Sequence, residues 1–494
     1  MKLMLKKQIV WLMPLAMTFA GCSDLLDKLP ENTVPVAGVD YSKTDQMYQP
    51  VSGVYATAQQ NFSSWTTYGL MVIRGDDVDK GSSPTDQIEF LWCKEFKYDR
   101  VKSFWALDSA FQWLYYVVMV ANSALESLDG YAGHITLEAD RARCTAYRAE
   151  VRFLRAYAYF RLMYLWGDVP ILENNQDLQV AKSHRTEVLA YLLEELQYCI
   201  DHLPALRPTE QPHNRGAVTK YSALALLAKV QLYEGNWQAV VSATEEIIGS
   251  CKFSLYPDYY QLFKIPGKLC DESLYELQFT DFGTGSGDRV GPDAWFTFQG
   301  PRGGDKPIEG WGFITPTAKL EAFMLARGED TRLHTTFLRT GETTLSGDYI
   351  KEGNPGEPTA YNGKAYTPSS QMTEGRNDYG ANNNVRILRY ADVLLMHAEA
   401  SIRLGGNGDA SLNEVRRRAC LEPVAGATVE DVLDERFAEL AMEWGDRFFD
   451  LVRTGRAAAE LPGFVEGRSA YYPIPQNQLD LNPNLNTYRE MTKE

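Results

Sequence analysis

The chain has 494 residues and a formal net charge of −16 at pH 7. A nucleic-acid-binding surface needs a basic patch, so this charge argues against one. With 45% hydrophobic and 12% aromatic residues, the chain can bury a large core. Its 28 tyrosines and 10 tryptophans are more than a core requires, and they indicate binding surfaces.

Residues 1–21 have the features of a lipoprotein signal peptide. Three lysines precede a short apolar run, 9–20, which cannot span a membrane as a mature helix. The small residues that follow end at Cys22 and resemble a lipobox, so we expect Cys22 to be lipidated. An ordinary signal peptide with an incidental cysteine is the alternative. Residues 22–41 are polar, and we expect them to form a tether. We expect residues 42–494 to form a single domain that the lipid anchors to the membrane.

A long helix predicted from Asp140 to Trp166 organises the chain. Most of its residues are Ala, Phe, Leu, Tyr or Met, so neighbouring helices should cover most of its surface. Gly167 and Pro170 mark its end. A second apolar helix, predicted at about 102–128, should form an antiparallel pair with it. The polar residues of the long helix recur every three or four positions and form one stripe: Arg141, Thr145, Arg148, Arg152, Arg155 and Tyr159.

Two later segments share a spacing that is typical of tetratricopeptide repeats. Ala228 and Ala398 are each followed by a glycine seven residues later, Gly235 and Gly405, and the second glycine is followed by Ala410. Any antiparallel helix hairpin gives a similar spacing. Together with the central helix, however, the pattern favours an α-helical superhelix, and we predict a mainly α fold.

Composition divides the domain into two parts. Residues 256–384 are rich in Gly, Pro, Thr and aromatics and have weak periodicity, which predicts an irregular, loop-rich subdomain of short helices and hairpins. The flanking residues, about 42–255 and 385–494, predict the helical scaffold that carries it. Within this scaffold, residues 61–100 mix aromatics with Gly and Asp and are expected to form loops.

Residues 282–313 are expected to bind the ligand. The stretch contains nine glycines, and Trp295, Phe298 and Trp311 are among its aromatics. Aromatic side chains on loops of a rigid scaffold often mark a binding surface, and their flat faces suit the apolar faces of sugar rings. Arg302, with Asp293 and Asp305, could bind sugar hydroxyls at the rim. The alternative is that the aromatics fill a core of the subdomain, although we expect at least one tryptophan to be exposed.

An acidic turn, residues 74–79, is a second candidate site. It contains Asp77, and Trp92 follows shortly after it. Its three aspartates could bind calcium, but the turn lacks the alternating ligands and the glutamate of an EF-hand. A solvated acidic turn is the commoner explanation.

Glu435, Glu439 and Glu443 lie four residues apart on one predicted helix, which raises the question of a glycosidase. Several arginines lie nearby, so a structural network of ion pairs is the favoured interpretation. Thr428 and Asp431 would cap this helix. The histidines show no metal spacing, the six cysteines after Cys22 are scattered, and no phosphate loop is present, so no cofactor or metal is expected.

Ordered blocks of residues resemble the SusD/RagB family of outer-membrane nutrient-binding lipoproteins. The blocks lie at 22–31, 150–170, 389–400, 435–455 and 472–485. The resemblance implies a scaffold of tetratricopeptide-like helix pairs in a lipid-anchored protein at the cell surface. It also implies that the three glutamates act in the fold, and it favours Asp77 and Trp92 as ligand contacts.

The resemblance further implies a function. A protein of this family would bind an oligosaccharide by aromatic stacking and hydrogen bonding, without catalysis. It would then deliver the sugar to a SusC-like TonB-dependent transporter in the outer membrane. A peptide ligand, as in the RagB branch, is one alternative. A secreted glycoside hydrolase and a pure interaction scaffold are the others, although no catalytic pair of carboxylates can be placed.

Overall fold

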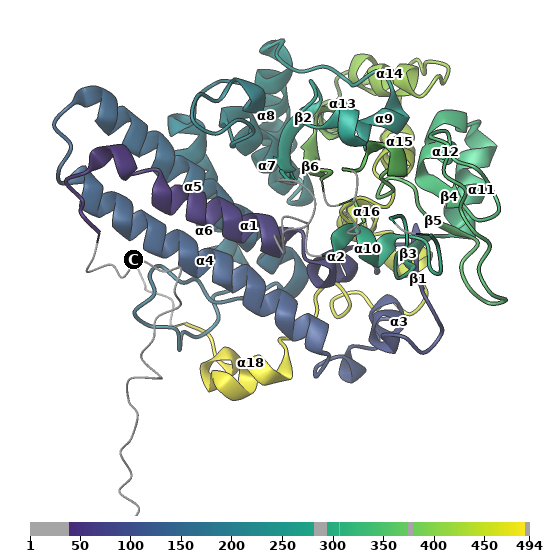
Figure 1. The fold of residues 1–494 in the computed structure, drawn as a ribbon, viewed down its shortest axis with the longest axis horizontal. Coiled ribbons are helices and arrows are strands. Elements are labelled where there is room, and N and C mark those ends of the chain that lie inside the picture. Colours follow the sequence, from purple (N-terminus) through teal and green to yellow (C-terminus); the bar gives the residue numbers. More distant parts are fainter. Residues whose placement is uncertain (1–38, 281–293, 306, 374–378, 381, 490–494) are drawn as a thin grey trace, which may run out of the picture.

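The computed structural model describes residues 39–280, 294–305, 307–373, 379–380 and 382–489. The predicted signal peptide, Cys22 and most of the predicted tether lie outside the described residues. Figure 1 shows the fold, in which helices predominate. Among the described residues, no helix combines the length and the apolar character that crossing a membrane requires.

Helices α4 and α5 are the longest, and they confirm the predicted antiparallel pair. α4 spans Trp105–Ala132 and α5 spans Glu138–Trp166. The C-terminal part of the polar stripe of α5 is used for packing, whereas Arg141 at its start is exposed. Arg152 and Arg155 both form ion pairs with Glu195, at 2.6 and 2.8 Å. These pairs attach α5 to the next helix of the array.

The scaffold is an array in which each helix packs on the next, as a superhelix requires. Contacts join α4 to α5, α5 to α6, α6 to α7 and α7 to α8, and α13 then joins α8 to α14 and α15. This confirms the mainly α fold and places the two repeat-like segments in the pairs α7–α8 and α13–α14. The further helices of the array are α1 (Gln49–Phe62), α6 (Arg185–His202), α7 (Lys220–Tyr233), α8 (Trp237–Gly249), α13 (Tyr390–Arg403), α14 (Asp409–Arg418), α15 (Val429–Glu439), α16 (Asp446–Arg453), α17 (Ala457–Glu460) and α18 (Gln476–Leu481).

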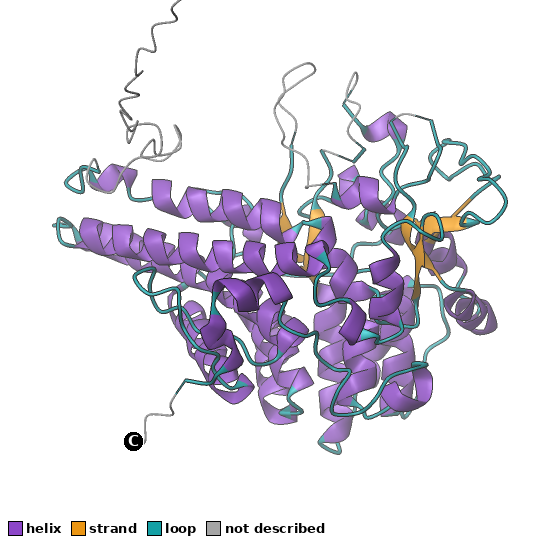
Figure 2. Ribbon diagram, turned by 90° about the horizontal axis from the view of Figure 1, so that it is seen from below, coloured by secondary structure: helices purple, strands orange, loops and turns teal. Residues whose placement is uncertain are grey.

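Loops, short helices and strands of residues 256–384 gather beside this array, and Figure 2 shows the strands in orange among them. The strands pair as β1–β3, β2–β6 and β4–β5, all antiparallel. The predicted hairpins are found only in part, because β4 pairs with β5 within this stretch whereas the other two pairs join segments far apart in the sequence. The elements are α9 (Tyr259–Leu262), β2 (Ser273–Leu277), α10 (Trp295–Gln299), β3 (Phe313–Pro316), α11 (Ala318–Arg327), α12 (Asp330–Thr336), β4 (Phe337–Arg339), β5 (Ala360–Asn362) and β6 (Val385–Arg389).

Residues 61–100 are not the loops that their composition predicts. They contain α2 (Trp65–Val72), β1 (Val78–Gly81) and α3 (Ile88–Lys94). α2 is buried along nearly its whole length, so it has no polar face and gives no helical periodicity to detect. Tertiary packing, rather than local sequence preference, makes this segment helical.

The glutamates near α15 form a buried network of ion pairs, as predicted. Glu439 contacts Arg332 at 3.1 Å and Arg389 at 2.9 Å, and Glu443 contacts Arg389 at 2.7 Å. One detail of the prediction was wrong: α15 ends at Glu439, so Glu443 lies in the turn that follows it. All six cysteines after Cys22 are unpaired.

Candidate functional site

Three tryptophans from three separate elements line one cavity of about 600 Å³. We call it the tryptophan cavity. Trp65 begins α2, Trp105 begins α4, and Trp311 lies just before β3. The ring of Trp65 stands edge-on to both others, with centroids 5.4 Å from Trp105 and 5.6 Å from Trp311. The outer two remain accessible, since Trp105 is 48% and Trp311 41% exposed.

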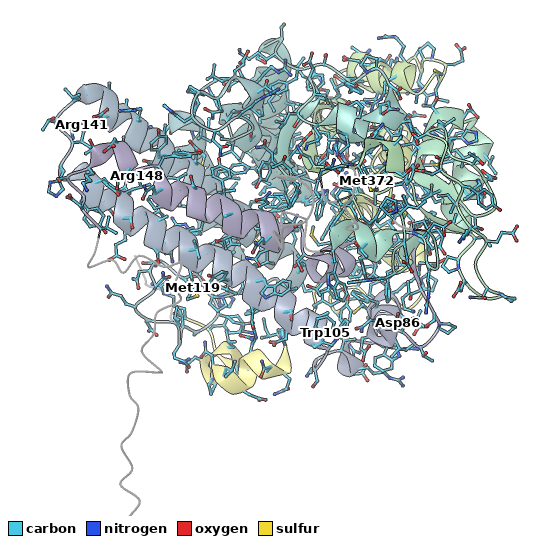
Figure 3. The ribbon with its side chains drawn as sticks, in the orientation of Figure 1. Asp86, Trp105, Met119, Arg141, Arg148 and Met372 are labelled. Atoms are coloured by element: carbon cyan, nitrogen blue, oxygen red, sulfur yellow. The ribbon has the colours of Figure 1, made fainter. Side chains whose placement is uncertain are left out.

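A layer of buried aromatics holds these rings in place. Phe298 is fully buried, lies 4.8 Å from the Trp65 ring, and stacks on Phe313 at 4.8 Å. The indole of Trp105 donates a hydrogen bond to Gln87 Oε1 at 3.1 Å. Figure 3 labels Trp105 and Asp86 at the same end of the molecule, where both line the cavity. The aromatic surface is therefore preorganised by packing and does not depend on a ligand.

Two glycines allow the Trp311 loop to cross itself. A Cβ atom on Gly310 would collide with the Cα, C and O atoms of Gly300. The crossing is fixed by backbone hydrogen bonds from Gly310 to Pro301 at 2.7 Å and from Trp311 to Thr297 at 2.7 Å. This close approach explains the glycine content of the loop better than flexibility does.

Polar side chains form the rim of the cavity. Arg302 donates to Ser82 Oγ at 3.0 Å and lies 3.6 Å from Glu357. Ser82 in turn donates to Asp86 at 2.9 Å. These bonds hold charged and uncharged hydrogen-bonding groups beside the exposed indoles. Such a combination suits a ligand with apolar faces and hydroxyl edges.

Two residues of the loop between β1 and α3 have a strained backbone conformation. Ser82 and Gln87 have φ values of 51° and 45°, a backbone conformation that residues other than glycine rarely adopt. Lys80 stabilises this loop by donating to the carbonyl groups of Ser83 and Asp86, at 2.7 and 2.8 Å. Burial lowers the pKa of Lys80. Strain that the surroundings enforce in this way is typical of functional loops.

The structure brings together some of the predicted site residues. Trp311 and Arg302 line the tryptophan cavity, and Phe298 is buried behind it against the ring of Trp65. Trp295 does not join them. It is 7% exposed and stacks on Trp444 beside a separate cavity of about 20 Å³, which is roughly the size of one water molecule. Asp293 lies outside the described residues, and Asp305 is paired with Lys351 at 2.6 Å.

Asp77 and Trp92 do not line the tryptophan cavity or the small cavity beside Trp295. Asp77 is 2% exposed and accepts a hydrogen bond from the backbone of Met442 at 3.1 Å. Trp92 lies partly buried in α3, beneath the guanidinium group of Arg100. Their geometry suits structural roles. Among the described residues, no cluster of three or more potential metal ligands is found, the acidic turn included.

Four residues that line the cavity were not predicted from the sequence: Trp65, Trp105, Asp86 and Gln87. Trp105 could have been found, because Trp105, Gln112 and Tyr116 follow helical spacing and interrupt an otherwise apolar helix. Trp65, Asp86 and Gln87 carry no comparable signal. Their part in the site depends on the pairing of β1 with β3, which brings the Ser82 loop against Gly312.

Two family models match the chain. One is described as the SusD family and matches residues 271–467, and the other is described as starch-binding, associating with outer membrane, and matches residues 15–232. A SusD-like protein of Bacteroides ovatus is 26% identical, over 92% of this chain and 83% of its own length. The starch-binding protein SusD of Bacteroides thetaiotaomicron is 25% identical, over 81% of this chain and 83% of its own length.

A solved structure shares the fold over most of both chains. Surface glycan-binding protein A from Bacteroides thetaiotaomicron, in complex with laminarihexaose, gives a TM-score of 0.71 at 24% identity. The match covers 88% of this chain and 97% of that one. Two family models over different parts of the chain, the curated relatives and the shared fold all agree that this chain is similar to the SusD family.

Proposed function

We propose that this protein captures an oligosaccharide in the tryptophan cavity. The supporting observation is the pair of accessible indoles, Trp105 and Trp311, held at the two sides of Trp65 with polar groups around them. Sugar rings stack on such surfaces through their apolar faces, and Arg302, Asp86 and Gln87 would bind the hydroxyl groups. The names of relatives support a glycan ligand, since one binds starch and another was solved with laminarihexaose.

Binding without hydrolysis is part of the proposal. The glutamates that sequence analysis considered for catalysis are engaged with arginines and Lys364 in the core. At the cavity, Glu357 faces Arg302 and Asp86 accepts from Ser82. The curated relatives are named as binding or SusD-like proteins.

The proposed setting is the outer surface of the outer membrane. One matching family model describes association with the outer membrane. Lipidation at Cys22 would supply the anchor, and the captured glycan would pass to a SusC-like TonB-dependent transporter. The anchor and the transporter both rest on the family resemblance.

Calorimetric titration tests the proposal. Residues 23–494 include every residue that the structure describes, and they would be titrated with laminarin, starch and other plant and host glycans, with product analysis for hydrolysis. We expect saturable binding without cleavage. Trp311→Ala should weaken it by about tenfold or more, because an aromatic anchor at the centre of a site carries a large share of the affinity.

Trp237→Ala is the matched control. Trp237 lies partly buried on α8, and it does not line the tryptophan cavity. The affinity of this variant should equal that of the parent protein. Cleaved sugar, or equal affinity of Trp311→Ala and the parent, would contradict the proposed function.

A further inference from the structure

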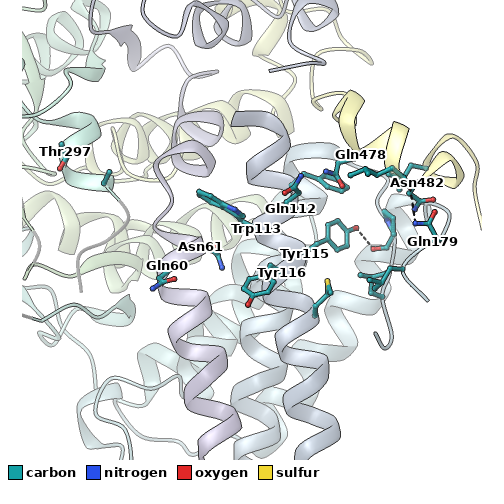
Figure 4. Close-up of a pocket in the computed structure, with 18 of the residues that line it drawn as sticks. Gln60, Asn61, Gln112, Trp113, Tyr115, Tyr116, Gln179, Thr297, Gln478 and Asn482 are labelled. Carbon is teal, nitrogen blue, oxygen red and sulfur yellow. Dashed lines mark hydrogen bonds between the residues drawn. The ribbon is translucent and has the colours of Figure 1, made fainter. Parts of the chain in front are cut away.

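A second cavity, of about 1030 Å³, lies further along α4. None of the twenty described residues that line it is Asp, Glu, Lys, Arg or His, although 23% of the chain is charged. We call it the neutral cavity. Figure 4 shows Trp113 between α4 and the end of α1, with Gln60 and Asn61 on that end and Thr297 beyond. Tyr116 and Gln112 lie on α4 beside it.

Helix α4 lines both cavities, and two further segments connect them. α1 places Asn61 in the neutral cavity just before α2 places Trp65 in the tryptophan cavity. α4 contributes Trp105 to the tryptophan cavity and Trp113, two turns later, to the neutral one. Thr297 of α10 lines the neutral cavity and accepts the backbone hydrogen bond of Trp311, at 2.7 Å. The two cavities are therefore neighbours along one surface.

The exposed face of α4 connects them. Trp105, Ser109, Gln112 and Tyr116 are spaced at three or four residues, so they lie in one row along the helix. Trp105 and Tyr116 are 48% and 54% exposed, and Gln112 is exposed between them. Eleven residues of helix span about 17 Å, which is longer than a disaccharide needs.

The lining of the neutral cavity has a definite chemistry. Trp113 and Tyr116 offer aromatic faces, and Gln60, Asn61 and Gln112 offer amide groups that both donate and accept hydrogen bonds. A carboxylate or sulfate group bound here would lose water without meeting an opposite charge, which is costly. Uncharged hydroxyl groups carry no such penalty. This lining favours a ligand without charge.

We propose that the two cavities form one extended site, in which an uncharged glycan chain runs from Trp311 and Trp105 along α4 to Trp113 and Tyr116. The inference rests on the proposed function and specifies its ligand. The glycan is neutral, without uronic acids or sulfate, and it is long enough to span both cavities. Short fragments fill the tryptophan cavity alone.

Fragments of graded length test this. The polysaccharide that binds in calorimetry would be cut into oligosaccharides from disaccharide to decasaccharide, and each would be titrated into the parent protein, Trp113→Ala and Tyr116→Ala. We expect affinity to rise with length and then to level off. Each variant should bind the longest fragment about tenfold more weakly. Both should bind the shortest binding fragment as the parent does.

Tyr349→Ala is the matched control for Tyr116→Ala. Tyr349 is 55% exposed, as against 54% for Tyr116, and it lines neither cavity. This variant should match the parent at every length. Thermal unfolding of each variant would show that it is folded before its affinity is compared.

The outcomes separate the two proposals. If Trp311→Ala weakens binding at every length while Trp113→Ala and Tyr116→Ala bind long fragments normally, the extended site is wrong and the proposed function stands. Stronger binding of polygalacturonate, alginate or a sulfated glycan than of any neutral one would also overturn the inference. If no glycan binds, the proposed function fails and the extended site fails with it.

Discussion

Asp77 is a carboxyl group that folding removes from water. Burial is the main cause that raises its pKa from 3.8 to about 6, and the hydrogen bond from Met442 offsets only part of this. A carboxyl group with a raised pKa in the folded state holds its proton more tightly there than in the unfolded chain. Its contribution to stability therefore falls as the pH rises from about 3.8 to about 6, and then stays constant.

Asp77→Asn removes this pH dependence. The amide oxygen can still accept from Met442, while the group no longer ionises. Relative to the parent protein, the variant should gain up to ~3 kcal/mol in free energy of unfolding between pH 4 and pH 8. Chemical denaturation at the two pH values measures this difference.

The same variant decides the role of Asp77. Because Asp77 lies outside the tryptophan cavity, Asp77→Asn should bind glycan as the parent protein does. A loss of affinity as large as that of Trp311→Ala would instead restore Asp77 as a ligand contact, as the family resemblance favoured. Similar affinity with a changed pH profile would establish the structural role.

The crossing of Gly300 and Gly310 is the element that presents Trp311. In Gly310→Ala the new methyl group would meet backbone atoms of Gly300, which cannot rotate away as a side chain can. The loop must shift, so we expect a loss of about 1–3 kcal/mol in the free energy of unfolding and weaker glycan binding. Denaturation and calorimetry measure the two effects.

Gly304→Ala is the control within the same loop. A Cβ atom at Gly304 would make ordinary contacts, the nearest at 3.5 Å from the carbonyl oxygen of Pro301. Its stability and affinity should remain close to those of the parent protein. If both alanine variants behave alike, the backbone crossing does not position Trp311.

Among the secondary-structure elements, the sequence predicts the long helices, whose apolar residues recur at regular intervals. α4 and α5 are long, so their apolar pattern repeats often enough to define them. α2 is short and buried on all sides, and its sequence carries no such pattern. β1 and β3 have four residues each, and nothing local specifies that they pair with one another.

The whole molecule is held together by buried charges as well as by apolar packing. Glu439, which is fully buried, contacts Arg332, Arg389 and Arg418 from three different elements. Burial alone would raise the pKa of Glu439, but the charges of Arg418, Arg332 and Arg389 outweigh it and lower the pKa to about 2. This carboxylate therefore joins the loop-rich part to the helical scaffold.

Glu439→Gln should destabilise the whole molecule by about 3–5 kcal/mol, because it leaves buried arginines without a full counter-charge. Since the folded pKa of Glu439 is depressed, its contribution is present above about 4.5 and is lost as the pH falls towards 2. The difference from the parent protein should accordingly shrink in acid. Thermal and chemical unfolding at several pH values measure it.

Glu430→Gln is the control on the same helix. Glu430 pairs with Arg456 at 2.7 Å, but its side chain is 59% exposed. Exposed ion pairs contribute little, so this variant should stay within about 0.5 kcal/mol of the parent protein. Equal effects of the two substitutions would mean that burial of the network adds nothing.

The sequence also does not specify which aromatic residues of the candidate site are exposed in the folded molecule. An exposed tryptophan could be predicted from the aromatic, glycine-rich loop, and Trp311 is exposed and lines a cavity with Arg302. Trp295 belongs to the same stretch and is nevertheless buried against Trp444. Which tryptophan faces solvent depends on neighbours from distant segments, and a single sequence does not specify those contacts.

The pairing of β1 with β3 also determines when the site can exist. During translation, Trp65 and Trp105 are synthesised long before Trp311. Contacts between segments so far apart in the sequence form slowly. The tryptophan cavity should therefore close late in folding. A chain that is truncated before β3, or released before it has finished folding, would contain two of the three tryptophans and lack the assembled cavity. The tryptophan cavity is thus a property of the completed protein alone.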